Sequence, residues 1–493
     1  MRTSFISLAV AGSLAIAVGG CTVGPNFAAP APPPPAAGYA SDGANRAVLG
    51  GGPDQRWWTA FGSPELDGLV DRAMASNHSL EASRATLSST RERIAAVAGR
   101  KLPQVDASAR VERELANLAA FGFSGGSGFP AISNPEFNLY TVGGGVSYDL
   151  DLFGRNRRAL EQVTAEAEAR ERETEAAHLT IAGRVVMQVL AIAAFNDRIA
   201  AANELLTERE RTVSLTRKRE KAGVGTQVEI LSAEAQLAND RSDLPELEQQ
   251  LAEGRAMLAV LLGISPAELG TTAFSLAQFK LDAAVPVALP SALVHKRPDI
   301  LVAEARLHAA TAAIVVATAK LYPDITLGAS LSQSSPAVGD ILSSGFRGYD
   351  IFAGLTAPIF HGGTLKAGKR GAEADARVAA ATYRQTVTEA FGQVSMLLSA
   401  LQNDARALTI QREAVDVAGR SRVLSRRSFE VGNSGILQVI EANRSWQRAR
   451  LAMVDVQARQ FENVARLYVA TAGGWALPEQ QVAVMKTAAP TTP

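Results

Sequence analysis

The sequence predicts a mainly α-helical fold with a small β component, built from one unit that occurs twice. Two stretches, 155–222 and 363–431, contain no proline and are rich in Ala, Glu, Arg, Leu and Gln. Three shorter segments alternate polar and apolar residues, as β-strands with two different faces do, and a fourth is similar with both faces less polar. Residues 69–111 can be laid on residues 289–331, and a match at such a distance indicates an internal duplication.

The composition is that of a folded protein without a nucleic-acid-binding role. Of the 493 residues, 47% are hydrophobic and 20% are charged, so the chain can bury a core. The formal net charge of 0 lacks the basic surplus of nucleic-acid binders. The single cysteine excludes an intramolecular disulfide. Beyond the first 20 positions no uninterrupted apolar run reaches the length of about 18 residues that would predict a transmembrane helix.

The first residues predict a secretory signal that ends at a lipidated cysteine. Arg2 precedes an apolar segment, 5–18, that is too short to span a membrane. Small residues then stand directly before Cys21, which resembles the lipobox of bacterial lipoproteins. An ordinary signal peptide with a chance cysteine is the alternative. The proline-rich segment 25–35 is expected to be an extended tether.

The duplication defines the expected domain organisation. Further matches pair residues 102–105 (LPQV) with 322–325 (YPDI), 151–154 (DLFG) with 359–362 (IFHG), 222–225 (AGVG) with 431–434 (VGNS), and 228–231 (VEIL) with 437–440 (LQVI). Each half is therefore expected to run helix, strand, strand, long helix, helix. The chain divides into a signal peptide (1–20), a lipidated and proline-rich linker (21–56), two repeats (57–288 and 289–475) and a C-terminal tail (476–493).

Four amphipathic strands are expected, at 104–112, 142–152, 324–332 and 351–360. Alternation over about ten residues is typical of a half-buried strand in a soluble sheet. It is equally typical of a strand that crosses an outer membrane with lipid on one side and water on the other. The strands alone leave both readings open.

The connections and the strand number favour the membrane. Both expected hairpins have long, polar or Gly-rich connections, at 114–135 and 332–348, like the outward loops of membrane barrels. Four strands cannot close a barrel, and lipid does not tolerate an open sheet edge. Closure then requires several chains. Three copies would give a barrel of about twelve strands, wide enough for a water-filled lumen.

The two long helices are expected to form a second, helical barrel. A helix over 155–222 would be about 100 Å long, a length found in coiled coils and large bundles. Apolar residues and alanines cover more than one face, which suits helices packed sideways against two neighbours. Gly223 and Gly432 end the long helices, and new helices begin near Thr226 and Gly435. Helical tips are thus expected far from the strands.

Several motifs, in order and spacing, identify a family resemblance. They are residues 21–27 (CTVGPNF), 57–61 (WWTAF), 148–155 (YDLDLFGR), 297–300 (RPDI), 303–305 (AEA), 321–323 (LYP) and 358–363 (PIFHGG). The sequence resembles the TolC-type outer-membrane efflux factors, in their NodT/OprM-like lipoprotein branch. The resemblance implies a trimeric channel-tunnel with a 12-strand outer-membrane β-barrel, four strands per chain, and a long periplasmic α-helical barrel. It also implies a belt from residues 38–64, 264–290 and the tail from Gly473.

The implied function is that of an outer-membrane channel in a tripartite efflux system. Such a channel is a passive exit duct for drugs or other small solutes, and its partners are a periplasmic adaptor (membrane fusion protein) and an inner-membrane RND-type pump. It would be lipid-anchored in the cell outer membrane and extend into the periplasm, since Thr22 follows the cysteine where inner-membrane retention usually has Asp. Two alternatives remain: an outer-membrane factor for type I protein secretion, and a non-porous periplasmic coiled-coil scaffold lipoprotein.

Site residues follow from the same resemblance. Cys21 is the lipidation site. Adaptor contacts are expected at the helical tips, where simple turn chemistry is the alternative, at Gly223, Val224, Gly225, Thr226, Gly432, Asn433, Ser434 and Gly435. Asp416, Arg420 and Arg422 are candidates for a periplasmic gate, with solvated surface charges as the alternative; the family's acidic gate residue falls on Gly419 here. We expect no enzyme activity, no catalytic residue, no cofactor and no metal site, because the histidines lack ligand spacing and the only cysteine lies in the lipobox.

Overall fold

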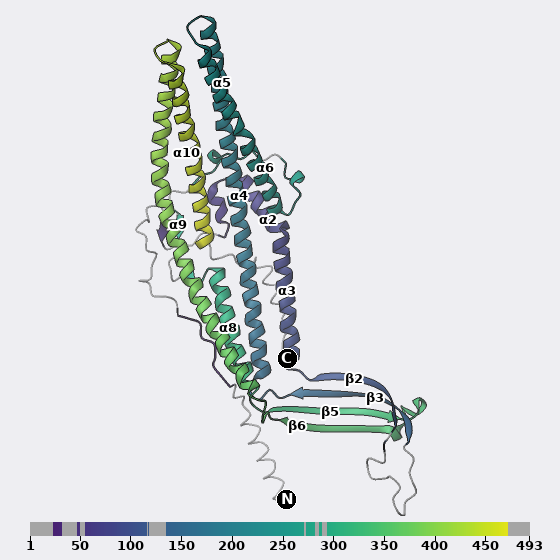
Figure 1. The fold of residues 1–493 in the computed structure, drawn as a ribbon. Coiled ribbons are helices and arrows are strands. Elements are labelled where there is room, and N and C mark those ends of the chain that lie inside the picture. The colour runs from purple at the N-terminus through teal and green to yellow at the C-terminus, as the bar shows by residue number, and fades with distance from the viewer. Residues whose placement is uncertain are drawn as a thin grey trace, which may run out of the picture. The chain divides into compact units, whose positions relative to one another are not determined.

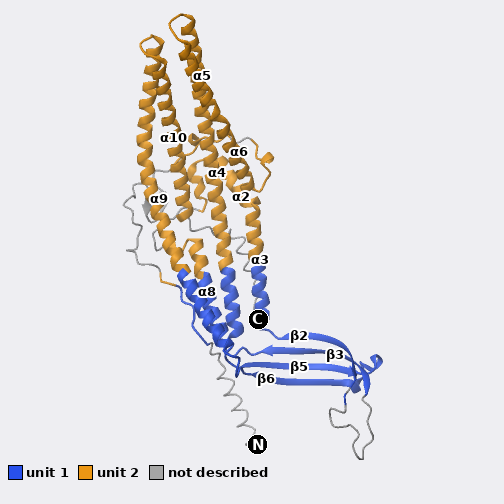
Figure 2. Cartoon of the chain, viewed as in Figure 1, with its two compact units in different colours: residues 1–29, 88–168, 305–381 blue, residues 30–87, 169–304, 382–493 orange. Residues whose placement is uncertain are grey.

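The computed structural model describes residues 23–31, 47–49, 55–115, 117, 135–270, 273–281, 285–287 and 293–471. Its elements follow one another in the duplicated order that the sequence predicts (Figure 1). The chain forms two compact units (Figure 2). Unit 1 comprises residues 1–29, 88–168 and 305–381, and unit 2 comprises residues 30–87, 169–304 and 382–493.

Unit 1 contains a four-stranded antiparallel sheet. Its strands are β2 (Gln104–Leu115), β3 (Glu136–Asp149), β5 (Asp324–Ser335) and β6 (Arg347–Thr356), in the order β2-β3-β5-β6. The two hairpins therefore come from the two halves of the chain and meet along β3 and β5. One ladder row joins Val105, Val146, Ala329 and Ile351 across all four strands.

All four predicted strands needed correction in their bounds: the first and third begin as predicted but end at Leu115 and Ser335, after the predicted 112 and 332. The second strand begins at Glu136, before the predicted 142, and ends at Asp149, because Asp151 has a positive φ of 48° that a strand does not allow. The fourth strand is Arg347–Thr356, not 351–360. Residues 357–360 follow it without regular structure. They were predicted as strand because they include the apolar residues Ile359 and Phe360, but both side chains are exposed outside the sheet.

The long helices have the bounds that the sequence predicts. Helix α4 (Arg155–Lys221) and helix α9 (Thr364–Glu430) each have 67 residues. After α4 the chain turns into α5 (Gln227–Ser242) and α6 (Leu244–Leu262), whereas after α9 a single helix, α10 (Ile436–Thr471), follows. Pro245, in the first turn of α6, explains the division, since proline lacks the N–H that a continuous helix needs. No proline occurs in α10.

The main hydrophobic core lies in unit 2. Its aromatic centre is formed by the 3-10 helix η2 (Trp57–Phe61). The ring of Trp57 stacks on that of Tyr468 of α10 with centroids 5.5 Å apart, and the ring centroids of Phe61 and Phe461 are 6.3 Å apart. The WWTAF motif is thus a core motif. The remaining elements are β1 (Ala47–Leu49), α2 (Pro64–Ser76), α3 (His78–Gly99), η4 (Pro266–Glu268), η5 (Leu276–Gln278), β4 (Val285–Val287), α8 (Pro298–Ala319), η6 (Val338–Asp340) and η7 (Ser344–Phe346).

Part of the implied belt is described. Strands β1 and β4 pair in parallel, and they fall inside the segments 38–64 and 264–290. The tail from Gly473 lies outside the described residues.

The RPDI motif also has a structural role. Arg297 donates two hydrogen bonds to the Asp299 carboxylate, at 3.0 and 2.6 Å, directly before α8. The same guanidinium donates to the carbonyl of Ala470 in α10 at 3.0 Å. This arginine therefore connects the start of α8 to the end of α10.

Two helices of the described chain are apolar enough, by length and composition, to cross a membrane. They are α4 and α8, and the apolar window of α4 is 67% buried inside the protein. Neither contains an uninterrupted apolar run of about 18 residues. Core helices pass the same composition test, so this feature is weak support for a helical span.

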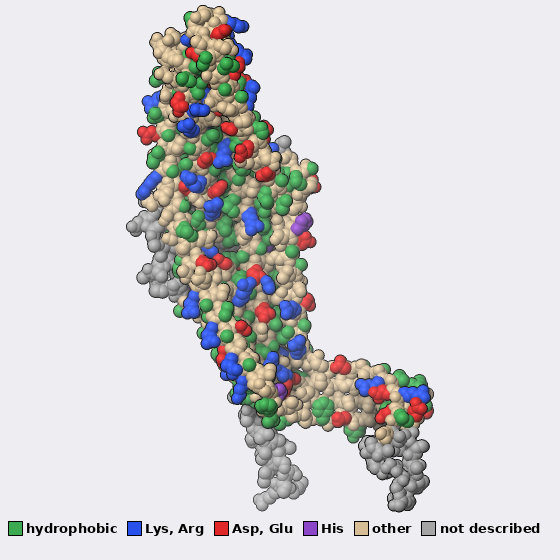
Figure 3. All heavy atoms as spheres, viewed as in Figure 1, with side chains coloured by type: hydrophobic (Ala, Val, Ile, Leu, Met, Phe, Trp, Pro, Cys, Tyr) green, Lys and Arg blue, Asp and Glu red, His purple; other side chains and the backbone are tan. Residues whose placement is uncertain are grey.

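Charges of both signs are interspersed over the helices on the face drawn in Figure 3. This distribution agrees with the formal net charge of 0. No extended single-sign field of the kind that steers nucleic acids is seen on that face.

Candidate functional site

The sheet of unit 1 has one apolar face and one polar face. Because the register is continuous, residues in the same ladder row point to the same side. One face carries mainly apolar residues, Val105, Ala107, Ala109, Val111, Val142, Val146, Tyr148, Leu327, Ala329, Leu331, Tyr349, Ile351, Ala353 and Leu355, and toward the hairpin loops it also carries Arg113, Asn138, Gln333 and Arg347. Its side chains are open to the surroundings of the chain, with Val105 78% and Ile351 77% exposed. An apolar face left this open suits contact with lipid.

The opposite face is mainly polar. It carries Gln104, Asp106, Ser108, Arg110, Glu112, Thr141, Ser147, Thr326, Ser330, Ser332 and Asp350. Arg110 and Glu112 pair on it at 3.0 Å. A strand set that is apolar on one side and polar on the other is what a barrel wall between lipid and water requires.

An aromatic ring covers a glycine on this polar face. Gly328 of β5 lies directly opposite Phe352 of β6. A Cβ atom at position 328 would lie 2.3 Å from Cζ of Phe352, so no larger residue fits while the ring is there. Gly328 and Phe352 therefore form one packing unit that ties β5 to β6.

Both edges of the sheet are open in the single chain. Among the described residues, β2 and β6 each pair with a strand on one side only. Their outer N–H and C=O groups have no partner strand there, and such edges do not persist in lipid. The first and last strands, β2 and β6, run in opposite directions, so the two open edges have the directions that an antiparallel pairing needs.

The junction between sheet and helix is held by charged groups. Arg155, the first residue of α4, lies 2.6 Å from the carboxylate of Asp149 and 2.7 Å from that of Asp324. Burial disfavours the guanidinium charge, but the two carboxylates outweigh this effect and raise the pKa of Arg155. The hairpins of both halves are therefore fixed to the same helix start.

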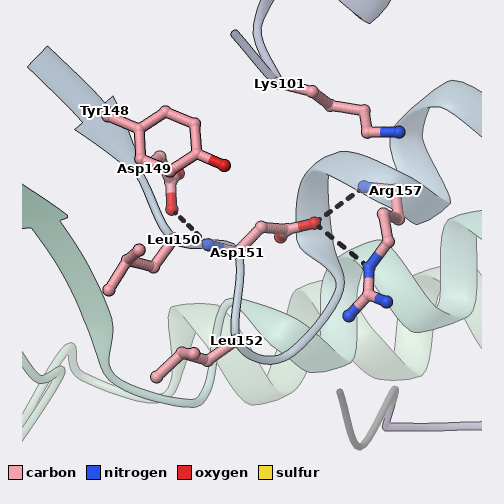
Figure 4. A pocket seen from close by; sticks show the side chains of 7 residues that line it. All are labelled: Lys101, Tyr148, Asp149, Leu150, Asp151, Leu152 and Arg157. Carbon is pink, nitrogen blue, oxygen red and sulfur yellow. Dashed lines mark hydrogen bonds and ion pairs between the residues drawn. The ribbon is translucent and has the colours of Figure 1, made fainter. Parts of the chain in front are cut away.

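Asp151 caps that helix start (Figure 4). Its carboxylate accepts hydrogen bonds from the backbone N–H groups of Asn156 at 2.8 Å and Arg157 at 2.9 Å. A hollow of about 280 Å³ lies beside it, and Lys101 and Tyr148 are among its lining residues. The YDLDLFGR motif thus builds a strand-to-helix corner, a role that satisfies the orphan N–H groups of the helix.

The first helical tip lies between α4 and α5. Gly223 has a φ of 73°, which ends α4, and the N–H of Val224 donates to the carbonyl of Arg219 at 3.0 Å. Thr226 caps α5 and forms a reciprocal capping box with Glu229. The turn chemistry that the sequence offered as the plain alternative is present here.

The second tip, between α9 and α10, repeats this geometry. Gly432 has a φ of 82°, and the N–H of Asn433 donates to the carbonyl of Ser428 at 2.8 Å. Both tips also expose apolar side chains. Val224, Val228, Val431 and Leu437 are each more than 60% exposed, which plain turns do not need.

One arginine joins the two tips, and the sequence did not reveal it. Arg219, near the end of α4, has its guanidinium 4.5 Å from the ring centroid of Phe429 in α9. It also donates to the carbonyl of Phe429 at 2.7 Å and to that of Val224 at 3.4 Å. Arg219 belongs to a basic stretch at the end of α4, and from sequence such residues are usually taken to interact with the negative end of the helix dipole.

The three gate candidates separate into two groups. Asp416 and Arg420 form an ion pair at 3.1 Å along α9, and both side chains are largely exposed. Arg422 instead lies over Trp446 of α10, 3.9 Å from the ring centroid. A Cβ atom at Gly419 would lie 3.6 Å from the same tryptophan. Glycine there leaves room beside the indole ring of Trp446.

A buried ion pair was also missed from sequence. Arg209 of α4 and Asp240 of α5 lie 2.6 Å apart, and their side chains are only 2% and 7% exposed. Gln236 donates to the same carboxylate at 2.7 Å. Many charged residues lie along both helices, and nothing in their sequence pattern marks these two as a buried pair.

Two predictions remain, the lipidation of Cys21 and the expected absence of a metal site. Cys21 lies outside the described residues. Within the described ranges, no group of three or more His, Cys, Asp or Glu side chains is placed to hold a metal ion.

Comparisons with known proteins agree with this geometry. A model of the protein family described as outer membrane efflux protein matches residues 69–264 and 289–473. The chain is 31% identical over 443 residues to the pyoverdine export outer membrane protein OpmQ of Pseudomonas putida, covering 90% of this chain and 92% of that protein. It is 30% identical over 463 residues to nodulation protein T of Rhizobium leguminosarum bv. trifolii, covering 91% and 92%. The solved structure of the outer-membrane channel OprN is similar, with a TM-score of 0.84 at 26% identity, and covers 92% of this chain and 100% of that one.

Proposed function

Because the chain belongs to the outer membrane efflux protein family, we propose that three copies form the outer-membrane channel of a tripartite efflux system. The channel is a passive exit duct for drugs or other small solutes. The observation that carries the proposal is the two-faced, four-stranded sheet with two open edges.

The family membership itself settles the class of protein. The predicted TolC-like fold is confirmed by the similarity to solved outer-membrane channels, and the sheet has the predicted four strands per chain. The protein is an efflux channel of the outer membrane. Its relatives are channel proteins rather than enzymes.

Shared closure of the barrel follows from the edges. The β2 edge of one copy pairs with the β6 edge of the next, and three copies close about twelve strands around a lumen. The polar face lines the lumen, and the apolar face meets lipid. This arrangement disfavours the non-porous scaffold, since a scaffold has no use for an exposed apolar sheet face.

An exposed apolar stripe supports side-by-side packing of helices from different copies. Ile410, Val417 and Leu424 recur at seven-residue spacing along α9, Val431 continues the spacing directly after the helix, and each is at least 50% exposed. A repeat of seven is the spacing of helices that pack with a left-handed supercoil. In the trimer this stripe packs against a helix of the neighbouring copy.

The tips and the gate candidates complete the duct. The exposed apolar side chains at the two tips, those of Val224, Val228, Val431 and Leu437, fit contact with a periplasmic adaptor. The adaptor links the channel to an inner-membrane RND-type pump. Asp416 and Arg420 lie on the exposed side of α9, where they can pair with a neighbouring copy when the entrance is closed. Arg422 stacks on Trp446 of α10 and so holds this part of α9 against α10. An adaptor of a type I protein secretion system is the second candidate partner.

The maturation of the chain is part of the proposal. Residues 1–20 are removed as a signal peptide, Cys21 is acylated, and residues 21–56 link the lipid to two repeats, 57–288 and 289–475, followed by a tail, 476–493. The supporting observation is that the only cysteine of the chain follows small residues at the end of a signal-like segment.

Light scattering of the detergent-purified protein, corrected for bound detergent, tests the trimer. A mass of three mature chains is the expected result, and a stable monomer would refute the shared barrel.

Cysteine pairs test the contact between the sheet edges of neighbouring copies, in a Cys21→Ser background. One cysteine scanned over Ala107, Ala109 and Val111 of β2 and one at Ala353 of β6 should give oxidation-dependent dimers and trimers on denaturing gels. A matched pair on the internal strands, Val146→Cys with Ala329→Cys, should link only within a chain.

A further inference from the structure

The segment after the lipobox lies against two helices of unit 1. A Cβ atom at Gly24 would be 3.0 Å from a methyl carbon of Val315 in α8. The carboxamide oxygen of Asn26 accepts a hydrogen bond from Nη2 of Arg158 in α4. The ring of Phe27 stacks on the imidazole of His308 in α8, with centroids 4.4 Å apart and planes 15° apart.

These contacts fix the direction of the segment. His308 and Val315 are seven residues apart in α8, a rise of about 10.5 Å along the helix. Phe27 and Gly24 are three residues apart, which spans about 10 Å in an extended chain. The segment therefore runs extended and antiparallel to α8, and its N-terminal end points toward Ala319 and the start of β5 at Asp324.

The surface under the segment is itself held in place. Nε2 of His308 lies 3.0 Å from the carboxylate of Glu161, and Arg158 lies 2.6 Å from the same carboxylate. Burial alone would raise the pKa of Glu161, but the bonds from His308 and Arg158 outweigh this effect and lower it. Glu161 thus stays ionised and orients both side chains that receive Asn26 and Phe27.

We propose that Gly24, Asn26 and Phe27 form a clamp that holds the start of the mature chain on α4 and α8, and so fixes where the acyl chains of Cys21 enter the membrane. The proposal rests on the lipidation proposed above. A linker alone would leave the lipid free to insert anywhere within its reach. The clamp instead directs it toward the end of the sheet where β5 begins.

The residue types at these positions agree with the clamp. Gly24 has a φ of 109°, which other residues rarely adopt, and a side chain there would press tightly against Val315. Phe27 supplies a flat ring for the imidazole, and Asn26 supplies an acceptor for a guanidinium whose side chain is only 11% exposed. The CTVGPNF motif is thereby explained beyond its cysteine.

The docking is tested by spin labelling in a chain that carries no lipid. Residues 1–20 are exchanged for a signal peptide of the general secretory type, Cys21 is changed to Ser, and Ala28, which is exposed, is changed to Cys and labelled. The label should give a largely immobilised spectrum. Phe27→Ala should lower the ratio of docked to undocked segment about 2- to 12-fold, the loss expected for one aromatic stack. Phe27→Tyr should restore it, and Phe346→Ala in the same unit should leave it unchanged.

The position of the anchor is tested in the lipidated protein. A photoreactive fatty acid, incorporated during growth, should crosslink mainly to the peptide around Lys320 to Asp324, and Phe27→Ala should spread the crosslinks over the chain. A mobile label at Ala28 in the parent, or crosslinks unchanged by Phe27→Ala, would overturn the clamp. A mature chain whose intact mass lacks acyl groups would refute the lipidation alone, because the spectra of the lipid-free chain do not depend on it.

Discussion

The guanidinium of Arg219 lies over the ring of Phe429, 4.5 Å from its centroid, and joins the ends of the two long helices. Arg219 comes from the first half of the chain and Phe429 from the second. Phe429 is fully buried, so the arginine covers a ring that would otherwise face water at the tip. The two tips proposed for adaptor contact are therefore coupled within one chain.

Arg219→Lys should loosen both tips. Lysine keeps the charge but cannot stack as a plane or donate to two carbonyls at once. A loss of about 1–2 kcal/mol in local stability is expected from the cation–π contact and its hydrogen bonds. Hydrogen exchange should then rise several-fold in peptides that cover 219–226 and 428–436. Arg217→Lys, in an exposed pair with Glu234, is the control, and equal exchange in both variants would contradict the coupling.

His178 gives the protein a predictable pH dependence. It is buried between α3 and α4, where Nδ1–H faces the carbonyl of Thr174 at 2.7 Å and Arg84 donates to Nε2 at 3.1 Å. Burial lowers the pKa of His178, the nearby Arg84 lowers it further, and the bond to Thr174 acts in the opposite direction. Above about pH 6.5 the imidazole is neutral in both the folded and the unfolded chain, and the full stability is present.

Below that pH the unfolded chain binds a proton that the folded chain resists, so stability falls. The midpoint of thermal unfolding should therefore decrease between pH 7.5 and pH 5.5. His178→Gln, which keeps a donor and an acceptor, should show a smaller decrease over the same range. Parallel curves for parent and variant would rule out His178 as the source.

Gly328→Ala should strain the sheet at Phe352. The added Cβ atom would overlap the ring, and overpacking of this kind costs about 1–3 kcal/mol. The trimer should dissociate at a lower temperature in detergent. Phe352→Ala in the same chain should recover much of the loss, because it removes the clashing ring. Gly354→Ala is the control, since the nearest atom to its Cβ would be 3.8 Å away.

Asp240→Ala should be strongly destabilising. It leaves the guanidinium of Arg209 buried without its counter-ion, and breaking a buried pair in this way costs about 3–5 kcal/mol. Glu210→Ala removes a partner of Arg241 from a pair in which both side chains are 57% exposed, and about 0–1 kcal/mol is expected there. Chemical denaturation of the two purified variants compares the two costs. Similar costs would mean that burial of the Arg209 pair does not govern its contribution.

Charge reversal at the gate candidates should open the periplasmic entrance. Asp416→Arg removes the partner of Arg420 and places like charges along α9. Arg422→Glu removes the contact with Trp446 and weakens the packing of α9 on α10. Cells that carry either variant should admit large antibiotics more readily than the parent, at equal expression. Arg412→Glu, an exposed change on the same helix, serves as control, and equal uptake in all strains would refute the gate.

Much of the fold could be predicted because the lengths of its helices and the faces of its strands depend on local sequence patterns. The absence of proline between 155 and 222 marks the length of α4, and the glycines at 223 and 432 mark the tips. Alternation in the strands marks their two faces. The ends of β3 and β6 were less predictable, since Asp151 continues the alternation after β3 has ended and apolar residues up to Phe360 follow the end of β6.

The sequence by itself determined the duplication, the helix lengths, the two-faced strands and the family, because each is carried by neighbouring residues or by motif order. Only the tertiary structure decided which distant residues meet. It pairs β3 with β5 across the two halves, places Arg219 on Phe429 and Arg422 on Trp446, and seats Phe27 on His308. The physical reason is that an arginine or a phenylalanine has the same local signature whether it is solvated or stacked, and packing between elements far apart in the chain selects between the two.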